Sequence, residues 1–89
     1  MARLLFTPQL QRFTAAPEVH STAQDLRSAL QDAFNAHPRL QGYILDEQGH
    51  LRPNVVIFID GQRVRDHRRL DDAIHEHSQI HVWQALSGG

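Results

Sequence analysis

The chain has 89 residues, 40% of them hydrophobic, and it contains no cysteine. This size allows one domain with a single modest core, and the missing cysteine excludes a disulfide, a thiolate metal site or a cysteine nucleophile within the sequence. A formal net charge of −1 argues against a general nucleic-acid or membrane binder, because both need a basic surface. All nine basic residues are arginine, so the chain cannot form a lysine Schiff base or accept an isopeptide bond on a lysine side chain.

The N-terminal region predicts a strand, a loop and a second, weaker strand. Residues 2–7 alternate, with Leu4 and Phe6 on one side, until a proline ends the strand because it cannot donate a ladder hydrogen bond. Residues 9–17 have the composition of a loop, and residues 18–20 follow as the weak strand. The opening residues turn polar too soon for a signal peptide or a spanning helix, so we expect a cytoplasmic protein.

The next segment gives the clearest helix signal. Ser21 or Thr22 can cap a helix, with Gln24 and Asp25 at the capping-box spacing. Five apolar residues then fall on one stripe of a helix of about four turns: Leu26, Ala29, Leu30, Ala33 and Phe34. A His-Pro pair at 37–38 ends it, since the residue before proline is pushed out of the α region.

The central region predicts strands joined by turns. Residues 43–45 are expected to form a strand, followed by a turn at 46–49. Residues 54–60 give the best strand in the chain, because they are rich in β-branched and aromatic side chains. An Asp60-Gly61 pair predicts a hairpin turn with a short return strand at 62–64.

The last third is polar until its final strand. Within residues 65–79 only Leu70, Ala73 and Ile74 are apolar, which predicts a helical turn that plugs one end of the core. Residues 80–83 alternate as a strand, and the sequence closes on Gly88-Gly89. Strands at both ends of the chain around one crossover helix predict a small α+β domain whose terminal strands meet in mid-sheet.

This pattern resembles the ubiquitin-like, β-grasp sulfur carriers, which include the small subunit of molybdopterin synthase and the thiamine-pathway and cysteine-pathway carriers. The resemblance rests on residues 51–65, on residues 70–74 and on a final strand that runs into Gly88-Gly89. It implies a mixed sheet of four to five strands with one main helix on one face, formed by residues 1–86, and a flexible tail at 87–89. The sequence departs from the family at residues 75–79, where an Asp-Gly-Asp turn is common.

The resemblance also implies a function. In the family, a partner E1-like enzyme uses ATP to adenylate the terminal glycine carboxylate, which is then converted to a thiocarboxylate and delivers its sulfur to a biosynthetic enzyme. Gly89 would be the reactive position and Gly88 its slim neighbour. The chain itself would be a carrier and not an enzyme, with no bound cofactor of its own.

A partner needs a docking surface, and the strand at 54–60 suggests one. This strand is apolar on both faces, whereas one helix can cover only one face of a sheet. We favour Val56 and Phe58 outward, extended by His81, Trp83 and Leu86. The alternative is that loops or another strand cover this side and make these residues ordinary core.

Other signals are weaker. His75, His77 and His81 could ligate a metal, but the first two are expected in a loop, so we favour solvated histidines and no metal site. The arginines at 63, 65, 68 and 69 form a local basic patch, interrupted by Asp66, that suits an acidic partner or a phosphate, although we favour a solvated polar edge. The alternatives left open are a modifier joined to other proteins through Gly89, a permanent synthase subunit, and a structural or metal-binding β-grasp domain.

Overall fold

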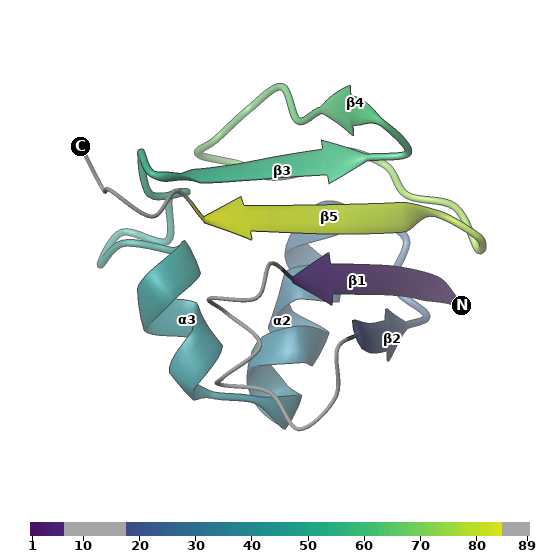
Figure 1. The fold of residues 1–89 in the computed structure, drawn as a ribbon, viewed down its shortest axis with the longest axis horizontal. Coiled ribbons are helices and arrows are strands. Elements are labelled where there is room, and N and C mark those ends of the chain that lie inside the picture. The colour runs from purple at the N-terminus through teal and green to yellow at the C-terminus, as the bar shows by residue number, and fades with distance from the viewer. Residues whose placement is uncertain (7–17, 85–89) are drawn as a thin grey trace.

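The structure is a computed structural model that describes residues 1–6 and 18–84. Figure 1 shows the strands forming one sheet, with α2 behind it and α3 next to α2 in the lower half of the view. The elements, in chain order, are β1 (Ala2–Phe6), β2 (Glu18–Ser21), α2 (Leu26–Ala36), α3 (Arg39–Ile44), β3 (Val55–Ile59), β4 (Gln62–Arg63) and β5 (Gln79–Gln84).

The sheet has five strands in the order β2-β1-β5-β3-β4. β1 and β5 pair in parallel, and the other neighbours are antiparallel. The first and last strands therefore meet in the middle of a mixed sheet, which confirms the α+β prediction and its central terminal strands.

The main helix buries the predicted stripe but begins later than predicted. All five stripe residues of α2 are buried. The N-cap is Asp25, whose Oδ2 accepts a hydrogen bond from Ser28 N at 3.0 Å. The capping prediction for Ser21 or Thr22 is wrong because Ser21 closes β2 instead, where its Oγ accepts from Ala23 N and donates to Asp32 Oδ2.

The predicted strand at 43–45 is also wrong, because residues 39–44 form the short helix α3. Leu40 and Ile44 lie four positions apart, so one helical face buries both of them while Tyr43 remains exposed. The turn at 46–49 is confirmed, with Gly49 N donating to Asp46 O at 3.0 Å.

The β3–β4 hairpin has the predicted two-residue turn. Asp60 and Gly61 have φ values of 51° and 84°, and positive φ at both central positions is the requirement of a type I′ turn. The segment between β4 and β5 contains no helix among the described residues, but Leu70 N donates to Asp66 O at 3.0 Å, the i→i+4 bond of the single helical turn predicted there. Leu70 plugs the core as predicted, fully buried, from a left-handed backbone position at φ 52°.

The turn before β5 is built without an Asp-Gly-Asp sequence. The Ser78 hydroxyl is buried, accepts from His75 N at 2.8 Å and donates to Asp60 Oδ2 at 2.9 Å. Asp60 Oδ1 also accepts from Gln79 N at 2.8 Å. These bonds tie the hairpin turn to the start of β5, so the fold retains this corner with a different set of side chains.

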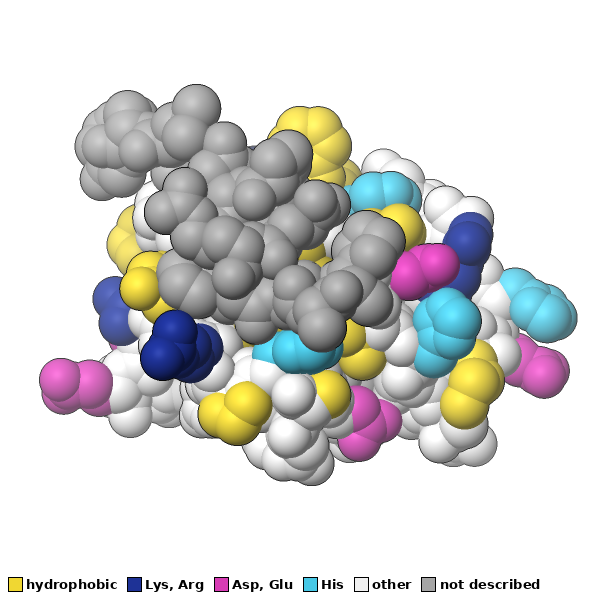
Figure 2. All heavy atoms as spheres, turned by 60° about the horizontal axis from the view of Figure 1, so that its bottom comes forward, with side chains coloured by type: hydrophobic (Ala, Val, Ile, Leu, Met, Phe, Trp, Pro, Cys, Tyr) yellow, Lys and Arg dark blue, Asp and Glu magenta, His cyan; other side chains and the backbone are white. Residues whose placement is uncertain are grey.

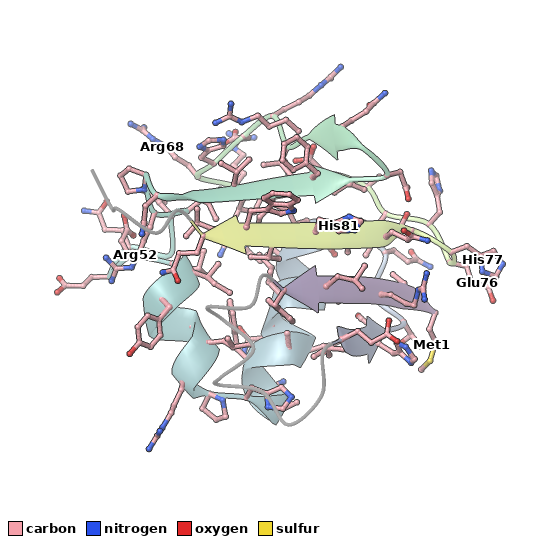
Figure 3. All side chains as sticks on the ribbon, in the orientation of Figure 1. Met1, Arg52, Arg68, Glu76, His77 and His81 are labelled. Carbon is pink, nitrogen blue, oxygen red and sulfur yellow. The ribbon has the colours of Figure 1, made fainter. Side chains whose placement is uncertain are left out.

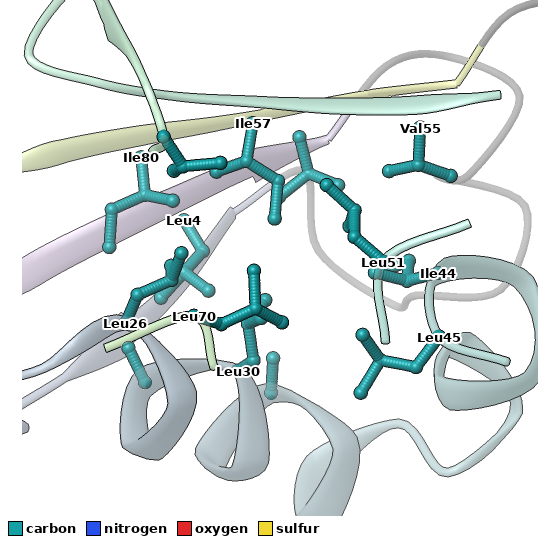
Figure 4. Packing of buried hydrophobic residues seen from close by; sticks show 14 of the residues in the cluster. Leu4, Leu26, Leu30, Ile44, Leu45, Leu51, Val55, Ile57, Leu70 and Ile80 are labelled. Atoms are coloured by element: carbon teal, nitrogen blue, oxygen red, sulfur yellow. The ribbon is translucent and has the colours of Figure 1, made fainter. Parts of the chain in front are cut away.

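One core fills the space between the sheet and the helices, as Figure 4 shows. The parallel strands β1 and β5 contribute Leu4 and Ile80, α2 contributes Leu26 and Leu30, and Ile57 comes from β3. Residues from every layer meet there, so the helices and the sheet stabilise each other.

Candidate functional site

The sheet has one covered and one open side, and β3 and β5 decide which residues are outward. Val55 and Ile57 are at most 1% exposed, whereas Val56 and Phe58 are partly exposed. On β5, Ile80 and Val82 are fully buried, while His81 is partly exposed and Trp83 is 55% exposed. The alternation therefore places Val56 and Phe58 outward, as we favoured from the sequence.

The strand register brings four of the predicted docking residues together. Val56 pairs with Trp83, and Phe58 pairs with His81. The Phe58 and Trp83 rings meet edge to face, with centroids 6.4 Å apart. We call Val56, Phe58, His81 and Trp83 the open face; the fifth predicted residue, Leu86, lies outside the described residues.

The open face forms a shallow hollow that includes residues we had not predicted. Arg63 joins it because the hairpin pairs Arg63 with Phe58. A two-residue turn at 60–61 fixes that register, so the sequence held a signal for Arg63. The hollow is lined by Asn54, Val56, Phe58, Gly61, Arg63, His81, Trp83 and Gln84.

The histidine cluster is not assembled. Figure 3 shows Glu76 and His77 in the turn at one end of the sheet, while His81 lies along β5. The described part of the chain holds no group of three or more His, Cys, Asp or Glu side chains placed to bind a metal ion. The geometry thus lends no support to the metal-binding alternative.

Charges of both signs are spread over the surface. Figure 2 shows arginine, acidic and histidine side chains interspersed with small apolar areas on one face of the molecule. Backbone N–H groups of Arg69 and Arg68 donate to Asp66 and hold the pKa of that carboxyl below its usual value.

Neither helix of the described residues is long and apolar enough to span a bilayer.

β5 leads from the middle of the sheet toward the predicted reactive end of the chain. It ends at Gln84, which pairs with Val55 beside the open face. Gly88 and Gly89 lie outside the described residues, so their role stays a prediction. Five residues follow Gln84 in the sequence, and a fully extended segment of that length reaches about 17 Å at most.

No family model and no curated protein matches the sequence. Solved structures do match it. SAMP1 from Haloferax volcanii has a TM-score of 0.82 at 19% identity, covering 99% of this chain and 98% of that one. A chain of the Amycolatopsis orientalis BexX/CysO complex has a TM-score of 0.86 at 14% identity and covers 100% of both chains.

Urm1 from Sulfolobus solfataricus is a third structure similar to this one, with a TM-score of 0.68 at 18% identity over 93% of this chain and 99% of its own. Identities this low establish likeness of fold, and they do so over nearly the whole length of each chain. The chain therefore has the ubiquitin-like β-grasp fold, as its sequence resemblance to the β-grasp sulfur carriers predicts.

Proposed function

We propose that this chain is a sulfur-carrier protein, in which a partner enzyme adenylates Gly89 and the adenylate is converted to a thiocarboxylate. The observation that carries the proposal is a β-grasp sheet whose central last strand ends at Gln84, five residues before the second glycine of a Gly-Gly pair. The proposal requires that Gly89 carry a free carboxylate in the mature protein.

The chemistry explains why a carrier would need such an end. A carboxylate is a poor acyl donor, so ATP first converts it to an acyl adenylate and pyrophosphate leaves. A sulfide nucleophile then attacks the acyl carbon, AMP leaves, and the product is a thiocarboxylate. The adenylate must be shielded from water inside the partner's site. Glycine suits a narrow entry channel because it has no Cβ to collide with the walls.

The open face supports this proposal as the docking surface for the activating enzyme and the sulfur-accepting enzyme. Trp83 exposes more than half of its surface, and Phe58 lies beside it. Exposed aromatic side chains that cluster in this way are typical anchors of protein interfaces. The carrier then contributes recognition and reach, and its partners contribute catalysis, ATP and the sulfur donor.

A second candidate is a protein modifier that joins Gly89 to lysines of other proteins. The similarity to structures named small archaeal modifier protein 1 favours keeping this possibility, at 15% and 20% identity. Both functions begin with the same activated glycine. They differ in the product, which is a thiocarboxylate in one case and an amide-linked adduct in the other.

The test is an intact-mass measurement after incubation of the protein with ATP, sulfide and an adenylating enzyme from the same cell. We expect a mass gain equal to sulfur replacing one oxygen at Gly89. Gly89→Ala should impair activation and leave the fold intact, because the added methyl acts only in the partner's channel. The matched control is Ser87→Ala, which changes the same tail without adding bulk at its end.

Four outcomes would contradict the proposal. A variant without Gly88 and Gly89 that still gains sulfur would contradict the role of the tail, and so would a native protein that continues past Gly89 untrimmed. An amide adduct on a substrate lysine, with no thiocarboxylate, would favour the modifier instead. A variant without the tail that keeps its full cellular role would favour a purely structural domain.

A further inference from the structure

Four exposed arginines lie on β4 and the loop that follows it: Arg63, Arg65, Arg68 and Arg69. We call this set the arginine rim. Within the described residues, none of their guanidinium groups forms an ion pair with a carboxylate at 4.0 Å or less. Four cationic groups in seven positions are thus presented to the surroundings on a chain whose net charge is −1.

The carboxylates of Asp66 and Asp72 in the same loop accept hydrogen bonds from its backbone, and the nearby charges of Arg69 and Arg68 also lower the pKa of Asp66. Asp66 Oδ1 accepts from Arg68 N at 2.8 Å and from Arg69 N at 3.0 Å. Asp72 Oδ2 accepts a hydrogen bond from Arg65 N at 3.4 Å. These carboxylates shape the loop through its backbone.

The loop backbone is held in place by the helix behind it. The Arg27 guanidinium on α2 donates to the carbonyl oxygens of Arg68 and Arg69, at 2.6 Å and 2.9 Å. Leu70 anchors the end of the loop in the core. The backbone that carries Arg68 and Arg69 is therefore held in place before any partner arrives, which lowers the entropic cost of binding through it.

The rim meets the open face at Arg63. Arg63 pairs with Phe58 and lines the same hollow as Trp83. Figure 3 places Arg68 at the end of the sheet toward which β5 points. An apolar centre with a charged border is the usual anatomy of a protein–protein interface, and arginine forks suit carboxylates in a bidentate manner.

We infer that the arginine rim binds an acidic segment of a partner protein whose apolar surface covers the open face. The inference rests on the proposed function for the identity of that partner as the adenylating enzyme. A nucleic acid is the less favoured occupant, because the rim has no interleaved aromatic side chains and the chain as a whole is slightly acidic.

The test is the steady-state kinetics of adenylation with the carrier as the varied substrate. The variant Arg68→Glu/Arg69→Glu should raise KM for the carrier about tenfold or more and leave kcat unchanged, because it repels the acidic segment before any chemistry. The fold should survive, since Arg27 binds the backbone carbonyls of these residues and not their side chains. The matched control is Arg39→Glu, an exposed arginine on α3.

Two further measurements sharpen the result. Arg68→Lys/Arg69→Lys retains the charge and should keep KM within about threefold of the parent, and raising the salt concentration should raise KM for the parent more than for the double glutamate variant. If the double glutamate variant changes KM no more than Arg39→Glu does, the rim is a solvated edge and the inference is wrong.

The two proposals can fail separately. If the parent is never adenylated, the proposed function fails, and the rim is then tested with poly-L-glutamate by following the arginine side-chain N–H signals in NMR spectra. Shifts concentrated at the four rim residues would support the inference. Shifts spread evenly over all nine arginines, or tighter binding of a DNA duplex or inorganic phosphate, would overturn it.

Discussion

At the residue scale, single aspartates fix the local geometry of this chain. Asp25, Asp46 and Asp66 each accept hydrogen bonds from backbone N–H groups, and these bonds lower the pKa of each carboxyl. The donor with the largest effect is Ser28 for Asp25, His50 for Asp46 and Arg69 for Asp66. Ionised carboxylates are the stronger acceptors, so each cap or turn is stabilised in the charged form. These three residues shape a helix start and two loops and need no catalytic role to explain their pKa values.

The Asp25 cap yields a stability prediction. Asp25→Ala should lower the free energy of unfolding by about 1 kcal/mol at neutral pH, because Ser28 N loses its acceptor at the helix start. Asp25→Asn should retain most of the stability, since asparagine caps helices well. Urea denaturation of the three proteins at pH 7 measures both effects, and an unchanged Ala variant would show that Asp25 contributes no cap energy.

The same cap has a pH dependence with a defined sign. The folded-state pKa of Asp25 is depressed, so its contribution is complete above the unfolded-state value of about 4 and is lost as the pH falls through the folded-state pKa. The parent should therefore lose more stability than Asp25→Asn on acidification below pH 4. Equal losses in the two proteins would mean that this carboxyl does not couple folding to pH.

The sequence could not select the cap because several candidates stand within five positions. Ser21, Thr22 and Asp25 can each accept an N–H bond, and a local pattern does not rank them. Tertiary contacts select the cap: Asp25 forms an isolated β-bridge with Ala73, and Leu26 N donates to Asp72 O at 2.9 Å. A contact nearly fifty residues away along the chain sets where the helix begins.

At the element scale, long periodic segments were predictable and short ones were not. The α2 stripe and the β3–β4 hairpin each follow from a repeat or a turn pair that is unambiguous by itself. Residues 43–45 are too few to distinguish the helical period of about 3.6 residues from the strand period of two. Their helix is decided by Leu40 and Ile44, which both reach the core only if the backbone coils.

Arg27 joins three elements and is expected to stabilise the loops it contacts. Its guanidinium donates to the carbonyl oxygens of Gly49, Arg68 and Arg69. Arg27→Gln should lower the free energy of unfolding by about 1–3 kcal/mol and increase amide hydrogen exchange at 46–51 and 66–70, because three carbonyls lose a charged donor. Arg39→Gln is the control for loss of an exposed arginine, and equal effects of the two variants would exclude a clamp.

At the scale of the whole molecule, one side of the sheet packs on the core and stabilises the fold, and the other side carries the proposed docking surface. Sequence alternation divided the residues of β3 into two faces, because a period of two assigns every second residue to the same face, and the burial in the structure decides that the favoured pair, Val56 and Phe58, is the outward one. It did not predict that the rim of arginines would meet this face at Arg63, since that requires the pairing of β4 with β3. The described residues place the open face beside the end of β5, and the sequence alone supplies the Gly-Gly pair.

Adjacent residues on β5 allow this separation to be tested with one matched pair. Trp83→Ser should change the free energy of unfolding by less than about 1 kcal/mol, because Trp83 is 55% exposed, yet it should raise the KM for the carrier in adenylation. Val82→Ala should cost about 2 kcal/mol, because Val82 is fully buried, and should leave KM for the folded carrier unchanged. Denaturant unfolding and adenylation kinetics on both variants read the two effects independently. If Trp83→Ser instead lost as much stability as Val82→Ala with KM unchanged, Trp83 would be a packing residue and partners would dock elsewhere on the molecule.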